Sequence, residues 1–194
     1  MVVKMAIKNS LIMVSLVKIF NCAETNYKKL SVENPDKLIE VQDSLLSISG
    51  DNQRIKDALV FANNSVAKKH LKNGNLKLAL QHFKKSTLID GDNKHSKFGV
   101  LIVEGRVLIN KGNKNGIWDA IEKFSEASSI FPENGEPFYW IARSYTKLGD
   151  TEFDLILESY EKSLTLDLDK DLRSEVQKSY DTVKNRKRKL DSFW

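Results

Sequence analysis

The stretch WDAIEKFSEASSIFPEN, residues 118–134, carries the pattern that decides the fold. Ala120, Phe124 and Ala127 are spaced four and then three residues apart, so their side chains lie on one face of an α-helix. A small, a large and a small side chain in one stripe leave room for a close neighbour. Pro132 follows, at a position typical of the chain just beyond a helix. The stretch therefore predicts a helix that packs tightly against a partner helix.

The same stripe occurs once before and once after this stretch. It recurs as Ala79, Phe83 and Ser86, and as Ile156, Tyr160 and Ser163. The segment before each stripe also repeats, because a small residue inside a predicted helix is followed seven residues later by a glycine that ends it. These pairs are Ala67 and Gly74, Gly105 and Gly112, and Ala142 and Gly149. The chain is therefore expected to contain three helix pairs in series.

Composition favours an all-α fold. The chain has 194 residues, of which 41% are hydrophobic, which suits one domain with a buried core. Only three prolines and nine glycines interrupt it, and long segments contain no proline. A helix is expected over residues 36–48 with Gly50 as its end. The next helix begins after Asp51 or Asn52 as the cap.

The helix pairs resemble the tetratricopeptide repeat, a helix-turn-helix unit of about 34 residues. The best matches are YWIARSYTKLGD, residues 139–150, for its first helix and residues 118–134 for its second. The resemblance implies a right-handed α-solenoid of about three such pairs over residues 61–169. Residues 36–60 and 170–194 would supply capping helices at its ends. It also implies a non-enzymatic scaffold that binds a protein or peptide partner in a groove and needs no cofactor.

Alignment with the repeat names the side chains expected to face the groove. The reference positions are the small residues of the first helices, Ala67, Gly105 and Ala142. The residue after each of them is a cation, and the residue three positions before each is an amide, an aliphatic or an aromatic residue. These residues are Lys68, Arg106 and Arg143, and Asn64, Ile102 and Tyr139. A line of cations would suit a partner segment that carries carboxylates. The alternative interpretation is a solvated basic helix face.

The spacing between elements is less regular than the stripes. The interval from each helix-ending glycine to the next stripe is five, eight and seven residues in the three units. This predicts insertions of three and two residues in the second and third turns. Residues 22–35 are polar and are expected to form a flexible tether.

Residues 1–21 have the composition of an export signal. They contain no acid, and Lys4 and Lys8 precede a short apolar run, residues 10–17. A membrane-spanning helix needs about 20 apolar residues, so this run is too short to be one. The expected signal peptide ends at the single cysteine, Cys22, which leaves no internal disulfide.

Ile19-Phe20-Asn21-Cys22 resembles a bacterial lipoprotein box. The resemblance implies cleavage before Cys22, lipidation of Cys22, and anchoring to the inner or outer membrane of a bacterial envelope. Asn21 and Lys18 depart from the usual box. The alternatives are an uncleaved amphipathic N-terminal helix and a cytoplasmic chain whose cysteine is a buried thiol.

Charge gives weak support for nucleic-acid binding. The net charge is +5, but the signal holds three lysines and no acid, so its removal would lower the net charge to +2. A basic tail remains near the C-terminus: Lys184, Arg186, Lys187, Arg188 and Lys189. It would suit nucleic acid or an acidic surface in a cytoplasmic adaptor, the alternative function, or form a solvated helix end. No aromatic residues are interleaved to stack on bases, which disfavours nucleic acid.

No catalytic or metal-binding pattern is present in the sequence. His70, His82 and His95 are not spaced to share a metal or to assist a nucleophile. No glycine-rich phosphate loop occurs. The sequence therefore predicts neither an enzyme nor a metal site.

Overall fold

The computed structural model describes residues 27–149 and 152–193. Ten helices, α2 to α11, occupy these described residues, which confirms the all-α prediction. The chain divides into two compact units, Met1–Ala62 and Asn63–Trp194, and their boundary falls inside α5 (Gln53–Lys72). The proposed signal segment and Cys22 lie outside the described residues. Within the described part of the chain, no helix is both long enough and apolar enough to cross a membrane.

The first unit contains three short helices and the start of α5. These are α2 (Tyr27–Glu33), α3 (Pro35–Glu40) and α4 (Gln42–Ser49). The structure corrects the tether expected over residues 22–35, because residues 27–33 form α2. This stretch contains neither Gly nor Pro, and Ser31 is buried. The single helix expected over residues 36–48 is also corrected, since it is interrupted at Val41.

Capping residues set the helix ends in this unit, and those at Gly50 and Asn52 were predicted from the sequence. Asn34 caps α3, because its Oδ1 accepts the N–H of Lys37 at 3.3 Å, and Pro35 occupies the first helical position. Gly50 has a φ of 54° and follows the last residue of α4. Asn52 caps the next helix, because its Oδ1 accepts the N–H of Arg54 at 3.1 Å.

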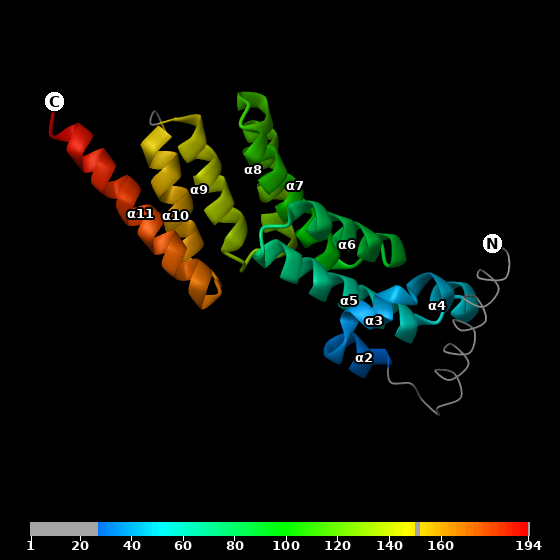
Figure 1. Ribbon diagram of the computed structural model, residues 1–194. Helices are drawn as coiled ribbons and strands as arrows, with labels where there is room; N and C mark the ends of the chain where they lie inside the picture. Colours follow the sequence, from blue (N-terminus) through cyan, green and yellow to red (C-terminus); the bar gives the residue numbers. More distant parts are fainter. Residues whose placement is uncertain (1–26, 150–151, 194) are drawn as a thin grey trace. The chain divides into compact units, whose positions relative to one another are not determined.

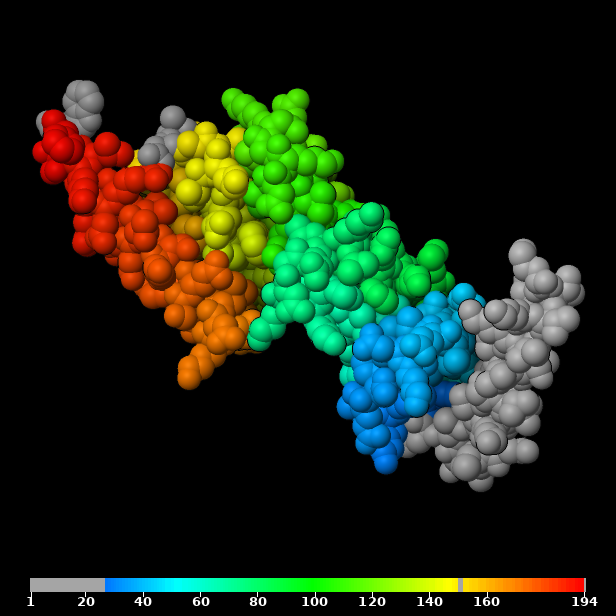
Figure 2. Space-filling model, viewed as in Figure 1, coloured from blue at the N-terminus to red at the C-terminus, as the bar shows by residue number. Residues whose placement is uncertain are grey.

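The second unit is a series of helices that pack on their sequence neighbours (Figures 1 and 2). After the last part of α5 come α6 (Leu76–Ile89), α7 (Lys94–Lys111), α8 (Lys114–Ile130), α9 (Glu136–Leu148), α10 (Phe153–Thr165) and α11 (Lys170–Asp191). In addition, α7 touches α9, so the first helices of these two successive pairs are in contact. The predicted arrangement of helix pairs in series is confirmed.

The three sequence stripes form the core of this unit. All nine stripe residues are at most 2% exposed. Phe83 packs with Ala67, Ala79 and Val103, and Phe124 belongs to the next apolar cluster. Tyr160 lies in a third cluster, which reaches α11. Each cluster joins consecutive helices, so the core is continuous along the series.

Two glycines of α7 allow the aromatic residues of the stripes to approach its backbone. A Cβ at Gly105 would lie 2.5 Å from the ring of Phe124, and a Cβ at Gly99 would overlap the ring of Phe83. Such distances are well inside van der Waals contact. Helix α7 is therefore contacted closely by α6 through one glycine and by α8 through the other.

The longer interval in the second helix pair, between Gly112 and Ala120, is occupied by helix. This corrects the insertion that was expected in the turn of that pair. Gly112 has a φ of 74° and ends α7, and α8 already begins at Lys114. Asn113 caps α8 by accepting the N–H of Gly116 at 2.7 Å. As a result α8 has 17 residues, whereas α6 has 14. The Asn113 cap allows the extra residues to extend the helix at its N-terminus.

Candidate functional site

A hollow of about 470 Å³ opens in the second unit where helices of successive pairs meet. We call it the α5–α9 hollow. Its lining comprises Lys68 and Leu71 of α5, Phe83 of α6, His95, Phe98, Gly99 and Ile102 of α7, the connecting residues Phe131, Glu133 and Asn134, Glu136 of α9, and Asp167 after α10. The hollow thus draws on three helix pairs.

The floor of the α5–α9 hollow is aromatic and aliphatic. Phe98 meets Phe131 edge to face, with ring centroids 5.4 Å apart. His95 stacks on Phe131, with ring centroids 4.9 Å apart. Ile102 also lines the hollow and is buried. Phe83 reaches the floor because Gly99 has no side chain to obstruct it. A large apolar side chain of a ligand would find aromatic partners here.

The edge of the hollow carries carboxylates that two connecting segments bring together. The backbone N–H of Asp167 donates to the carbonyl of Glu133 at 2.8 Å, and the N–H of Gly135 donates to the carbonyl of Asp167 at 2.9 Å. This pairing holds the α8–α9 connection beside the α10–α11 connection. The side chains of Glu133 and Asp167 are both exposed. Sequence reasoning missed this pair, because no helical spacing relates two connections that far apart in the chain.

Glu136 adds a third carboxylate at the first turn of α9. Its Oε1 accepts the indole N–H of Trp140 at 3.2 Å. Burial raises the pKa of Glu136 above its ordinary value, while the bond from Trp140 and the nearby charge of Arg106 lower it. The hollow therefore has more acidic than basic side chains, since Glu133, Glu136 and Asp167 line it together with one lysine, Lys68.

The predicted groove residues divide into three groups. Lys68 is exposed at the edge of the hollow and Ile102 lies in its floor, so these two line it. Asn64 is buried and joins α5 to α7, because its Oδ1 accepts the hydroxyl of Ser96 at 3.1 Å. Tyr139 is only 1% exposed and belongs to the core. Arg106 lies outside the lining, as does Arg143.

Both arginines contact other side chains of the chain. The guanidinium of Arg106 lies 4.5 Å from the ring centroid of Trp140, and burial lowers the pKa of Arg106. Arg143 donates to the hydroxyl of Tyr139 at 2.8 Å and lies 3.5 Å from Glu175 of α11. The Tyr139 hydroxyl also donates to Glu175, and burial together with this bond raises the pKa of Tyr139. The anion that pairs with Arg143 thus comes from the same chain.

The basic tail lies along the last turns of α11 and partly against α10. Lys184 donates to the hydroxyl of Tyr180 at 3.1 Å, Arg186 lies 5.5 Å from the ring centroid of Phe153, and Lys187 pairs with Asp154. Arg188 and Lys189 are exposed. Three of the five cations are therefore engaged in contacts within the chain.

The histidines show no arrangement suited to a metal. His70 and His82 stack with ring centroids 5.7 Å apart and an angle of 13° between the rings. Ring nitrogens bind a metal through lone pairs in the ring plane, so stacked parallel rings do not converge on one ion. Within residues 27–149 and 152–193, no group of three or more metal-ligating side chains is assembled.

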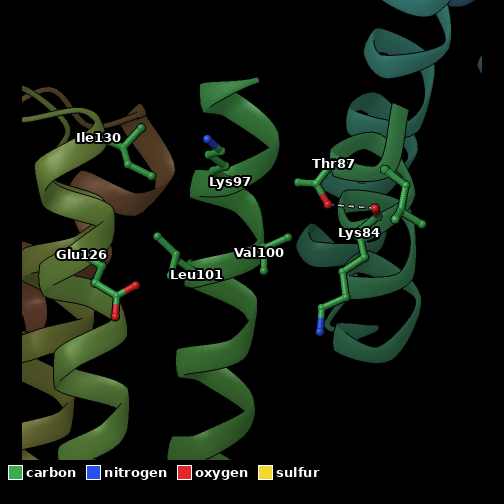
Figure 3. A pocket seen from close by; sticks show the side chains of 8 residues that line it. Lys84, Thr87, Lys97, Val100, Leu101, Glu126 and Ile130 are labelled. Atoms are coloured by element: carbon green, nitrogen blue, oxygen red, sulfur yellow. Dashed lines mark hydrogen bonds between the residues drawn. The ribbon is translucent and has the colours of Figure 1, made fainter. Parts of the chain in front are cut away.

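A second hollow, the α6–α8 hollow, lies over α7 between α6 and α8 (Figure 3). Val100 of α7 points toward α6, and Leu101 points toward α8. The charged residues at its edge each have a partner within the chain: Lys84 with Glu104 at 2.8 Å, Lys97 with Asp92 at 3.3 Å, and Glu126 with Lys123 at 3.0 Å. It therefore presents apolar surface but little uncompensated charge, and the α5–α9 hollow is the better candidate for a specific site.

Comparisons with known proteins show a similarity of fold. No protein-family model matches the chain, and no curated protein matches it. Among solved structures, the chain is similar to the crystal structure of MamA, with 16% sequence identity and a TM-score of 0.47. The similarity covers 87% of this chain and 98% of that one.

Proposed function

We propose that this protein is a non-enzymatic scaffold that binds a segment of another protein in the α5–α9 hollow. The proposal depends on one observation: an open hollow with an aromatic floor and a charged edge lies where three helix pairs meet. Concave sites of a few hundred Å³, apolar inside with a few polar groups at the edge, are typical of binding sites. Helices stacked in series also present extended surfaces that suit a chain segment.

Removing Phe131 tests whether the hollow binds. It belongs to the aromatic floor and contacts both His95 and Phe98. Peptides selected from a displayed random library against the full chain are expected to bind the Phe131→Ala variant at least tenfold more weakly, because large aromatic contacts dominate such interfaces. Trp118→Ala is the matched control, since Trp118 is a larger aromatic, 47% exposed, outside the lining. Equal affinity of every selected peptide for both variants would contradict the proposal.

We further propose that Cys22 carries a lipid that holds the scaffold at a bacterial cell envelope. The support comes from the sequence, namely the basic and apolar segment before Cys22 and the similarity of residues 19–22 to a lipoprotein box. Four residues separate Cys22 from the first residue of α2. Since each residue spans at most about 3.6 Å, the anchor would hold α2 within roughly 18 Å of the lipid surface.

The mass of the chain purified from its native membranes tests this anchor. We expect a mature chain that begins at Cys22 and carries added acyl mass, and we expect a Cys22→Ala variant to lose both the cleavage and the added mass. An unprocessed wild-type chain with a free thiol would refute the anchor and leave the binding proposal intact.

A further inference from the structure

We propose that the segment bound in the α5–α9 hollow carries a large apolar side chain next to a lysine or arginine. This inference rests on the proposed binding function and specifies the chemistry of the partner. It reverses the sign expected from the sequence, which pointed to a partner that carries carboxylates.

The charge at the edge of the hollow is predominantly acidic. Glu133, Glu136 and Asp167 all line it, whereas Lys68 is its one lining lysine or arginine among the described residues. The carboxylates of Glu133 and Asp167 are exposed, and no hydrogen bond or ion pair found within residues 27–149 and 152–193 uses either of them. They are therefore available to a cation of the partner.

The cations that would have attracted an acidic partner are directed elsewhere. Arg106 stacks on Trp140, and Arg143 is paired with Glu175. Neither residue lines the hollow. An acidic segment lying in the hollow would meet Lys68 as the one lining lysine or arginine and would be repelled by the exposed carboxylates of Glu133 and Asp167, so complementarity favours a basic segment.

The position of the acidic edge is determined by the backbone. Main-chain hydrogen bonds of 2.8 and 2.9 Å hold the two connections together, so the spacing between the main chains of Glu133 and Asp167 does not depend on flexible side-chain contacts. A prearranged edge loses less conformational entropy when the partner binds. The aromatic floor formed by Phe98 and Phe131 adjoins this edge within the same hollow. An apolar anchor in the floor would thus place an adjacent cation near the carboxylates.

Selection of a random nonapeptide library, displayed on phage, against the full chain tests the inference. Peptides that also bind the Phe131→Ala variant are discarded. The remaining peptides are expected to be enriched in an aromatic or aliphatic residue next to Lys or Arg. Enrichment in Asp or Glu, or no charge preference, would overturn the inference while leaving the binding function supported. Recovery of no Phe131-dependent peptide would overturn the binding function and this inference with it.

Charge-neutralising variants then test the edge directly. The best synthetic peptide from the selection is expected to bind Glu133→Gln/Asp167→Asn about 3- to 10-fold more weakly than wild type at low salt, because two exposed charge contacts are lost. Added salt should weaken binding to wild type more than to this variant. Asp119→Asn/Glu122→Gln removes the same charge from exposed positions of α8 outside the hollow and should bind like wild type. Unchanged affinity and salt dependence in the edge variant would refute the inference.

Discussion

Replacing Phe124 by alanine is expected to lower the free energy of unfolding by about 3 to 5 kcal/mol, the usual cost of emptying a buried phenylalanine site. Its side chain is fully buried in an apolar cluster that joins α7, α8 and α9. The ring lies over Gly105 and stacks on Trp140, with centroids 6.1 Å apart. Rigid helices surround the cavity that would remain, so it cannot collapse fully. Urea unfolding followed by far-UV circular dichroism measures the loss.

Phe193→Ala is the control for this variant. Phe193 is 82% exposed, so its removal should change stability by less than about 0.5 kcal/mol. Gly105→Ala provides a second check, because its added Cβ would press on the Phe124 ring, and the strain should disappear when Phe124 is also alanine. A loss below about 1 kcal/mol for Phe124→Ala, or additive effects in the double variant, would contradict the packing described for this cluster.

Gly135→Ala is expected to cost about 1 to 3 kcal/mol and to weaken peptide binding as well. A Cβ at Gly135 would overlap the backbone carbonyl oxygen of Ser163 and would lie 3.0 Å from Leu168. Main chain cannot swing aside as a flexible side chain can. The hydroxyl of Ser163 also donates to the Gly135 carbonyl at 2.8 Å inside the core. The α8–α9 connection must therefore move away from the end of α10 and from Leu168 of the α10–α11 connection, which disturbs the pairing of Glu133 with Asp167 that shapes the hollow.

Gly91→Ala separates this close approach from a general effect of replacing glycine. A Cβ at Gly91 would meet its nearest atom, the carbonyl oxygen of Thr87, at 3.8 Å, an ordinary contact. We expect its stability to stay within about 0.5 kcal/mol of wild type. Urea unfolding and the affinity of a selected peptide are the measurements. If Gly135→Ala matched Gly91→Ala in both, the contact between the two connections would not determine the edge of the hollow.

Sequence spacing identified the core residues because helical geometry relates residues three and four apart. The stripe Ala120, Phe124 and Ala127 predicted a face for close packing, and all three side chains are fully buried. Gly74 and Gly112 were predicted to end their helices, and both have φ values in the left-handed region, at 76° and 74°. Each of these features depends on local geometry, which the order of residues specifies directly.

The same reasoning predicted only part of the α5–α9 hollow. Alignment within first helices brought out Lys68 and Ile102, which line the hollow. It also selected Arg106 and Arg143, which do not line the hollow. Helical spacing could not show that Arg106 contacts Trp140 and that Arg143 pairs with Glu175. Periodicity shows which face of a helix a residue occupies. It does not show which side chain from another helix lies opposite.

The sequence by itself therefore determined the all-α class, the succession of helix pairs and the stripes that pack them, because these follow from spacings within one helix. Tertiary structure alone decided the position of Asp167 beside Glu133 and the need for glycine at position 135. The φ of Gly135 is −79°, which any residue can adopt, so its backbone conformation does not require glycine. Glycine is required because Ser163, 28 residues away in the sequence, packs closely against it. Such contacts join segments distant in the chain, and their energies depend on how the helices pack.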